Sequence, residues 1–272
     1  MNFKEITGIN NTSTVKPLDE WVQEQCDSEN SKEGNLTGYD CEKCKNRGYI
    51  SKVNNLMLVT SRCECMDIRE TLKRIKESGF GEIIKKCTFD NFETEIKLTK
   101  RIKELSLEYL DAVNNGKSQW LFIGGQSGAG KTHICTAIST ELIKSGKTAR
   151  YMVWPQDAPT IKANINDSEL YPVLINPLKK CDVLYIDDLF KIGEDKGEKV
   201  KPSPADIRLA FEIVNYRSLQ SKTITIVSSE FALDEIIAID RALGSRIKQL
   251  SEGYIMNIPN KEEYNYRLRK VE

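Results

Sequence analysis

The segment 125–132 carries the strongest chemical signal in the chain. It matches the phosphate-loop pattern G-x4-G-K-[ST], lies directly after an apolar stretch and precedes a helical pattern. Glycines let the backbone bend around phosphate and direct N–H groups at the anion. Lys131 would reach the outer phosphates and the Thr132 hydroxyl would bind Mg²⁺. The residues predicted to bind nucleotide are Gly125, Gln126, Ser127, Gly128, Ala129, Gly130, Lys131 and Thr132.

Two carboxylates, Asp187 and Asp188, follow the apolar stretch 183–186. Such a stretch is typical of a buried parallel strand, and ligands of α/β sheets bind at the carboxyl ends of strands. Asp187 is predicted to hold Mg²⁺, largely through its water shell, and Asp188 to orient and polarise the attacking water. Alone, the pair would more readily be interpreted as solvated turn residues. Its position downstream of the phosphate loop favours the metal site.

A third polar group, Ser228-Ser229-Glu230, ends the apolar stretch 223–227. One of these side chains could lie between the two preceding strand ends and contact the attacking water or the γ-phosphate. Which of them does so stays open at this stage. We take Ser229 and Glu230 as the candidate catalytic residues.

Four of the eight cysteines form two close pairs separated by eighteen residues. The first pair is C-x2-C and the second is C-x-C, a spacing that can converge on a tetrahedral zinc site. The intervening segment has few apolar residues, so metal binding would supply much of its folding free energy. Redox thiols and coincidence are the alternatives. The predicted zinc ligands are Cys41, Cys44, Cys63 and Cys65.

The composition argues against several classes of protein. The 272 residues include 40 basic and 40 acidic side chains, so the overall field would not draw the chain to nucleic acid or to an anionic membrane. No apolar stretch approaches the roughly 20 residues needed to cross a bilayer, and the first residues lack a signal-peptide core. We therefore expect a cytoplasmic protein with no membrane partner.

Apolar strands and amphipathic helices alternate over the C-terminal two thirds of the chain. This alternation predicts an α/β domain with a mostly parallel, helix-covered sheet. A capping box at Ser203 to Asp206 is expected to open one helix. The predicted strands are 120–124, 148–153, 183–186, 223–228 and 253–258, and further predicted helices are 97–113 and 131–145.

Residues from about 40 to 272 resemble the DnaC/DnaI type of bacterial replicative-helicase loader, which are AAA+ ATPases. The resemblance lies in the phosphate loop continued by His133, in Asp187-Asp188, and in the box Ser245-Arg246-Ile247. Shorter matches are 88–92 and 214–217. The cysteine unit, followed by Met-Asp-Ile-Arg, looks like the phage and mobile-element branch of that family.

The resemblance implies a fold and roles for individual residues. The fold is an AAA+ P-loop core with a parallel five-stranded sheet of order 5-1-4-3-2 and no C-terminal lid domain, so that a neighbouring subunit would enclose most of the nucleotide. Adenine would lie near Phe89 and Phe92, with His133 also in the nucleotide-binding set. Arg246 would be the arginine finger offered to a neighbouring subunit, and Arg217 would lie near a subunit boundary. Asp188 stands where glutamate is usual, and Glu230 where many relatives carry asparagine.

Composition, cysteine spacing and helical periodicity along the chain indicate a domain organisation. The expected parts are a flexible N-terminal segment (1–38) with a linker at 27–38, a zinc-binding unit (39–66), a connecting helix (67–86) and the AAA+ ATPase domain (87–272). A short amphipathic helix beginning at Pro17 carries Leu18 and Trp21. It is either a helicase-binding element or a helix packed on the zinc unit.

The function implied is ATP-dependent loading of a replicative hexameric helicase onto single-stranded DNA by a homo-oligomer, a ring or a spiral. ATP, Mg²⁺ and Zn²⁺ would be the cofactors, and hydrolysis would be slow and partner-stimulated. The location would be the bacterial cytoplasm, or that of the host if the chain is phage-encoded. DNA contacts are expected around Lys162, Lys179 and Lys180. The alternatives are a transposition-helper AAA+ ATPase, a P-loop small-molecule kinase and a non-catalytic zinc-bearing adaptor.

Overall fold

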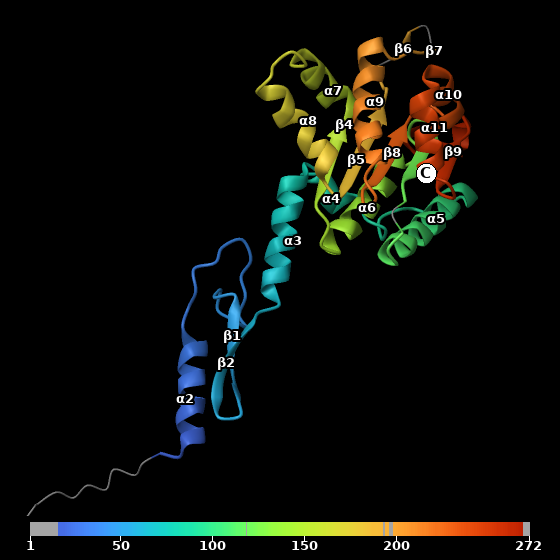
Figure 1. The fold of residues 1–272 in the computed structure, drawn as a ribbon. Coiled ribbons are helices and arrows are strands. Elements are labelled where there is room, and N and C mark those ends of the chain that lie inside the picture. The colour runs from blue at the N-terminus through green and yellow to red at the C-terminus, as the bar shows by residue number, and fades with distance from the viewer. Residues whose placement is uncertain (1–15, 118, 193, 196–197, 269–272) are drawn as a thin grey trace, which may run out of the picture. The chain divides into compact units, whose positions relative to one another are not determined.

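The computed structural model describes residues 16–117, 119–192, 194–195 and 198–268. The chain divides into two compact units, 1–72 and 73–272 (Figure 1). The first fifteen residues of the predicted N-terminal segment lie outside the described part. Each unit is described by itself, and helix α3 (Cys65–Ser78) spans the division between them.

In the N-terminal unit, helix α2 (Leu18–Ser31) packs against the hairpin of β1 (Tyr49–Asn54) and β2 (Met57–Arg62). Val22 and Cys26 are its buried residues, and the Asn30 side chain donates a 2.9 Å hydrogen bond to the carbonyl of Ser51. Of the two predictions for this helix, packing on the cysteine unit is what the structure shows. Leu18 and Trp21 stay exposed on its outer side.

Helix α2 also corrects the linker prediction. Residues 27–31, predicted as linker, form the C-terminal end of this helix. Composition alone favours disorder there, but the contacts of Cys26 and Asn30 with β1 stabilise the end of the helix, and such tertiary packing supplies most helical stability in proteins.

The second unit is built on a five-stranded parallel sheet. Its strands are β3 (Leu121–Gly125), β4 (Ala149–Val153), β5 (Val183–Leu189), β8 (Ile224–Ser229) and β9 (Ile255–Ile258). They lie in the order β4-β5-β8-β3-β9, with every pair parallel. Numbered within the sheet, this is 5-1-4-3-2, so the predicted order and sheet type are confirmed.

Helices cover both faces of this sheet, which is why the strands are apolar on both sides. Leu121 and Ile123 of β3 belong to one core cluster and Phe122 to the other. Figure 1 shows the helices flanking the strands. Their bounds are α4 (Ile83–Lys86), α5 (Lys97–Asn114), α6 (Lys131–Lys144), α7 (Trp154–Ala163), α8 (Leu170–Lys180), α9 (Pro204–Ser218), α10 (Leu233–Ile239) and α11 (Arg241–Leu250).

Four short elements complete the described part of the unit. The charged loop after β5 contains β6 (Glu194–Asp195) and β7 (Glu198–Lys199), and β9 is followed by the 3-10 helices η1 (Glu262–Tyr264) and η2 (Tyr266–Leu268). The capping box is confirmed at the start of α9, where the Ser203 hydroxyl accepts from the backbone N–H of Asp206. No helix within the described residues combines the length and the apolarity needed to span a membrane.

Several basic residues have internal partners that the sequence did not predict. Arg217 is fully buried, and its guanidinium donates to the Thr225 hydroxyl and to backbone carbonyls including that of Cys181. Its place near a subunit boundary stays a prediction. Lys162 and Lys179 form ion pairs with Asp206 and Glu212. Their charges are thus engaged within the unit, whereas Lys180 is exposed.

Candidate functional site

The phosphate loop links β3 to α6 and is shaped by glycines. Gly125, Gly128 and Gly130 have φ values of 103°, 76° and 82°, in the left-handed region where side chains are strained. A Cβ on Gly125 would lie 2.0 Å from the carbonyl oxygen of Ile258. The loop therefore needs glycine both for its curvature and for its close approach to β9.

The side chain of Lys131, the first residue of α6, reaches back to the start of this loop. Its Nζ donates to the carbonyls of Gly125 (2.9 Å) and Gln126 (2.7 Å). An ammonium has three N–H donors, so these contacts leave one for an anionic ligand. Burial lowers the pKa of Lys131, while the carboxylates of Asp188 and Glu230 oppose that shift. A phosphate beside this amine would compensate for its lost hydration.

Asp187, near the end of β5, is buried and accepts four hydroxyl hydrogen bonds. Its Oδ1 receives Thr132 at 3.0 Å, Tyr185 at 2.6 Å and Ser228 at 2.5 Å, while Oδ2 receives Tyr151 at 2.8 Å. Tyr151 and Tyr185 are register partners in β4 and β5, so the pairing of these strands brings both hydroxyls to one carboxylate. We call these four donors the hydroxyl cage.

The four hydroxyl donors of the cage are divided unequally between the two oxygens of Asp187. A carboxylate has about four lone-pair sites, two on each oxygen, so Oδ1 is saturated and Oδ2 has room for a further donor. The contact between Asp187 and the phosphate-loop threonine brings together the two residues that the sequence predicted as magnesium ligands. Hard oxygen ligands beside a phosphate loop fit Mg²⁺, which keeps several waters in such sites.

Asp188 and Glu230 are joined by a lysine that the sequence analysis did not single out. Lys191 Nζ lies 3.0 Å from Asp188 Oδ2 and 2.9 Å from Glu230 Oε1. Asp188 has φ of 56°, and a register shift interrupts β5 between Ile186 and Leu189. This local bend turns the second carboxylate out of the strand, so that it lines the cavity while Asp187 stays in the cage.

The two carboxylates have different proton affinities. Burial raises the pKa of Asp188, although its hydrogen bond with Lys191 opposes the rise. Burial would also raise the pKa of Glu230, but hydrogen bonds from Lys191 and Ser127 lower it below its usual value. A carboxylate with a raised pKa is the better proton acceptor. Asp188 is therefore the better-suited general base of the two.

The two serines that end β8 are placed differently from the expectation. Ser228, not Ser229, contacts Asp187, and it also accepts the backbone N–H of Asp188 at 3.1 Å. The Ser229 hydroxyl donates to the carbonyl of Leu189 and is buried away from the cavity. A strand's alternating sides explain the difference, since only one of two successive residues can face the site.

Of the two phenylalanines expected near adenine, one lines the cavity and the other does not. Phe92 is buried and lines the cavity, where its ring meets that of His133 edge to face at 5.3 Å. His133 also lines the cavity, and its Nε2 is 2.8 Å from the carbonyl of Thr88. Phe89 packs into the core beneath and is not among the lining residues.

One cavity of about 290 Å³ lies over the phosphate loop. Asp188 and Lys191 line it, whereas Asp187 and Glu230 are not among its lining residues. Besides Lys191, the lining residues that the sequence did not predict include Tyr264, Tyr266 and Arg267. The signal that could have found them is the aromatic spacing Tyr-x-Tyr-Arg after β9, whose last residue Ile258 pairs with Gly125 of the phosphate loop.

Arg246 lies outside this cavity. Its guanidinium is 5.0 Å from the centre of the Phe211 ring, and its Nη1 donates to the carbonyl of Ala242 one turn earlier in α11. The structure thus does not bring Arg246 to the phosphate loop of its own chain.

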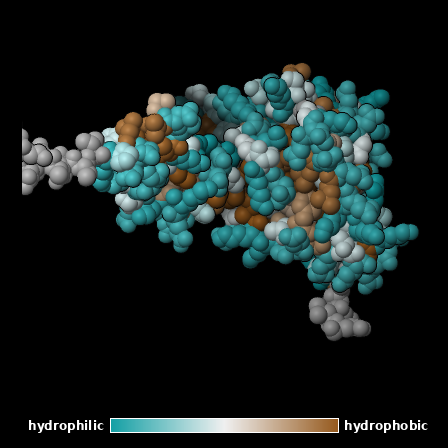
Figure 2. All heavy atoms as spheres, turned by 90° about the horizontal axis from the view of Figure 1, so that it is seen from below, coloured by the Kyte–Doolittle hydropathy of each residue, from teal (hydrophilic) through white to brown (hydrophobic). Residues whose placement is uncertain are grey.

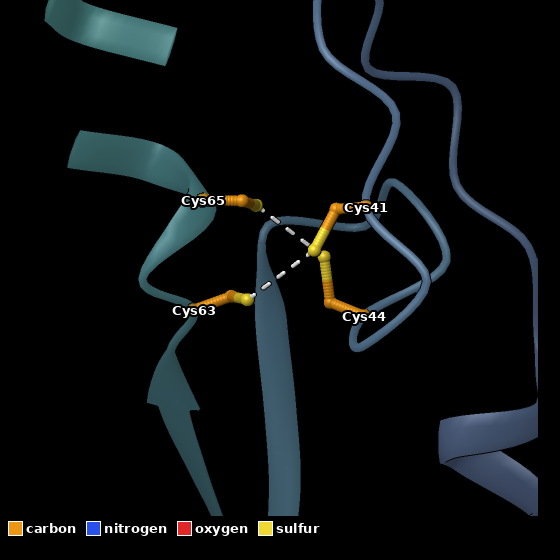
Figure 3. A group of neighbouring side chains, drawn as sticks. All are labelled: Cys41, Cys44, Cys63 and Cys65. Carbon is orange, nitrogen blue, oxygen red and sulfur yellow. Dashed lines mark hydrogen bonds between the residues drawn. The ribbon is translucent and has the colours of Figure 1, made fainter. Parts of the chain in front are cut away.

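The four predicted zinc ligands converge in the N-terminal unit (Figure 3). Cys41 and Cys44 come from the loop before β1, and Cys63 and Cys65 from the end of β2 and the start of α3. Their Sγ atoms all lie within 4.8 Å of one another and are buried. The backbone N–H of Gly48 donates to the Cys44 sulfur at 3.3 Å, a contact that favours a thiolate.

The cysteine cluster fits a tetrahedral metal site. Zinc–sulfur bonds of about 2.3 Å at tetrahedral angles separate the sulfurs by about 3.8 Å. The observed Cys41–Cys63 and Cys44–Cys65 sulfur distances are 3.9 and 3.5 Å. Burial raises the pKa values of Cys63 and Cys65, so four thiolates in this place need a cation.

Comparison with known proteins identifies the family. The model of the IstB-like ATP binding protein family matches residues 49–240. The chain belongs to this family. It is also 31% identical over 249 residues to the phage-like element PBSX protein XkdC of Bacillus subtilis (strain 168), covering 88% of this chain and 90% of that protein.

Further IstB-like relatives include replicative helicase loaders. The loader DnaC of Buchnera aphidicola subsp. Baizongia pistaciae (strain Bp) is 29% identical over 154 residues, which cover 56% of this chain and 59% of DnaC. The crystal structure of DnaI has a TM-score of 0.50 at 18% identity, covering 68% of this chain and 92% of DnaI. The structural likeness shows the AAA+ P-loop fold alone.

Proposed function

We propose that this chain is an AAA+ ATPase that loads a replicative DNA helicase onto single-stranded DNA. The observation that carries the proposal is that Lys131, Thr132 and Asp188 line one cavity. Asp187 contacts Thr132, and Lys191 links Glu230 to Asp188. Membership of the IstB-like ATP-binding family and the likeness to DnaC support it. The biological role rests on the relatives, and the chemistry rests on the site.

The site supports ATP hydrolysis by direct attack of water. Backbone N–H groups of the phosphate loop and Lys131 would hold the phosphates of ATP. Mg²⁺, held at Thr132 and Asp187, would offset the charge of the outer phosphates. Asp188, whose pKa burial raises, would orient the attacking water and take its proton.

Hydrolysis would be completed by a neighbouring subunit through Arg246. The Arg246 side chain is partly exposed on α11 and does not reach its own cavity, as expected of a residue that acts in trans. Arginine fingers accelerate phosphoryl transfer by about 10³ to 10⁵. Slow hydrolysis by the isolated chain, and faster hydrolysis in an assembled ring or spiral, follow from this arrangement.

The N-terminal unit offers a surface for the helicase. Figure 2 shows a largely hydrophilic surface that is interrupted by apolar areas on this unit. Exposed apolar residues gather on the hairpin, at 56–59, while Leu18 and Trp21 are exposed on α2. Exposed apolar clusters mark interaction sites more often than scattered single residues do. Lys180 is the remaining candidate for a DNA contact.

The hydrolytic step is tested by Asp188→Asn. We expect this variant to bind ATP as the wild type does, because it keeps the phosphate loop and Lys131. It should lose hydrolysis, because it lacks the proton acceptor. Unchanged phosphate release would favour the structural use of ATP expected of a zinc-bearing adaptor. Transfer of phosphate to an acceptor other than water would instead favour the kinase alternative.

The loading role is tested by capture from the native cell in the presence of ATP. We expect the wild type to recover a hexameric helicase and Lys131→Ala to recover none. Lys144→Ala is the matched control, since it removes an exposed lysine from the same helix α6. Recovery of a transposase in place of the helicase would favour the transposition-helper alternative.

A further inference from the structure

The segment that follows β9 contributes to the lining of the cavity over the phosphate loop. We define the post-β9 segment as residues 261–267. Tyr264, Tyr266 and Arg267 of this segment line the cavity together with the phosphate loop. Asn91 and Phe92 also line the cavity, so its aromatic lining comes from two segments far apart in the sequence.

Direct hydrogen bonds fasten the post-β9 segment to the phosphate loop. The backbone N–H of Tyr266 donates to the carbonyl of Gly128 at 2.9 Å, and that of Lys261 donates to Gln126 Oε1 at 2.6 Å. A Cβ on Gly128 would lie 2.1 Å from Asn265 Oδ1. The segment and the loop therefore share one packed interface within a single chain.

The exposed groups of the segment suit a nucleoside phosphate. Tyr264 is half-buried against the core, while Tyr266 is 44% exposed and lines the cavity. The Arg267 guanidinium forms no ion pair with any carboxylate of residues 16–268 that the structure describes. Aromatic rings stack on any base through its π-face, and a cation without a carboxylate partner attracts phosphate.

We propose that the post-β9 segment is a nucleotide clamp within the same chain, in which Tyr266 contacts the base of a bound nucleoside triphosphate. The proposal rests on the proposed function, because it takes the cavity as the ATP site. It adds a contact that depends on the base, whereas the phosphate loop contacts only the phosphates. Closure of the site then requires less of the neighbouring subunit than the family resemblance implies.

The experiment compares ATP with inorganic tripolyphosphate, which has the phosphates and lacks the base. Both are titrated into the full chain as competitors of a fluorescent ATP analogue. For Tyr266→Ala we expect the ATP dissociation constant to rise about fivefold or more, on the scale of one lost stacking contact. The dissociation constant of tripolyphosphate should change less than twofold.

Two further variants isolate the ring of Tyr266. Tyr266→Phe keeps the ring and should bind ATP within twofold of the wild type. Tyr49→Ala removes a tyrosine of similar exposure, 42%, from the other unit and should leave both constants unchanged. Equal weakening of ATP and tripolyphosphate by Tyr266→Ala would overturn the clamp, because the segment would then only shape the phosphate loop.

The remaining outcomes also discriminate. If the wild type binds ATP and Tyr266→Ala binds it equally well, the clamp is wrong and the proposed function stands. If the wild type binds tripolyphosphate as tightly as ATP, no base contact exists and the clamp is likewise wrong. If the wild type binds neither, the proposed function itself fails.

Discussion

The hydroxyl cage around Asp187 makes a quantitative prediction through Tyr185→Phe. This change removes one hydroxyl and keeps the ring. The Tyr185 hydroxyl lies 2.6 Å from Asp187 Oδ1, and both side chains are buried, so water cannot replace the lost donor. A hydrogen bond to a charged group contributes about 1.5 to 3 kcal/mol. We expect the free energy of unfolding to fall by that amount.

The matched control for this prediction is Tyr109→Phe. Tyr109 is equally buried, but its hydroxyl donates at 2.9 Å to the neutral carbonyl of Gln119. Hydrogen bonds between neutral groups contribute about 0.5 to 1.5 kcal/mol. The Tyr185 hydroxyl also lies 3.1 Å from the Ser228 hydroxyl. Tyr185→Phe therefore removes a neutral contact together with the charged one, whereas Tyr109→Phe removes the neutral contact with Gln119.

Urea unfolding followed by tryptophan fluorescence measures both losses. Trp120 and Trp154 are buried in the second unit, and a Trp21→Phe background removes the signal of the N-terminal unit. A loss for Tyr185→Phe that does not exceed that for Tyr109→Phe would refute the charged cage. Tyr185→Phe should also need more Mg²⁺ than the wild type for half-maximal ATP hydrolysis. Tyr109→Phe should need no more Mg²⁺ than the wild type.

Three other predictions concern zinc, acid stability and assembly. The purified chain should hold one zinc ion, and Cys63→Ser should lower the zinc-to-protein ratio while Cys135→Ser, in the buried core, should not; equal ratios would contradict the site. Burial raises the pKa of Asp206, but hydrogen bonds from Lys162 and Ser203 outweigh burial and lower it. Its stabilisation is therefore complete above the unfolded pKa of about 3.9 and is lost as pH falls through the lower folded value. Asp206→Asn should cost about 1.5 to 3 kcal/mol at pH 7 in urea unfolding, and its deficit should shrink below about pH 4; a deficit independent of pH would contradict the ion pair. Arg246→Ala should keep ATP binding and lose hydrolysis, and mixing it with Lys131→Ala should restore some phosphate release only if the arginine acts in trans.

The sequence predicts the phosphate-binding residues well because the motif that identifies them is continuous in the chain. The phosphate loop, Lys131 and Thr132 are consecutive, and a turn between an apolar strand and a helix leaves little freedom for their placement. The zinc cluster could be predicted for the same reason. The two cysteines of each pair are close in sequence, so the fold has only to bring the two pairs together. The apolar stretches fix the strands, and the family resemblance supplies their order.

Contacts that depend on strand register could not be predicted in this way. Tyr151 reaches Asp187 only because β4 pairs with β5 in one particular register. Lys191 bridges Asp188 and Glu230 because β5 bends at its end. The residue types at this position do not predict the bend. Ser228 and Ser229 differ by one position, and periodicity without a register does not say which of them faces the site.

The helix end at residues 27–31 illustrates the opposite failure. Local composition predicted a linker, and contacts with β1 override it. Arg217 is a similar case, because an arginine is expected at the surface and this one is held by carbonyls inside the unit.

The central claim is that a nucleoside triphosphate occupies the cavity ahead of Lys131. Isothermal titration of ATP with Mg²⁺ into the zinc-loaded chain tests it most directly, using Lys131→Ala and Lys144→Ala alongside the wild type. The account predicts one ATP bound per chain, unchanged binding by Lys144→Ala, and affinity reduced about tenfold or more by Lys131→Ala. Absence of binding by the wild type, or equal binding by Lys131→Ala, would contradict it.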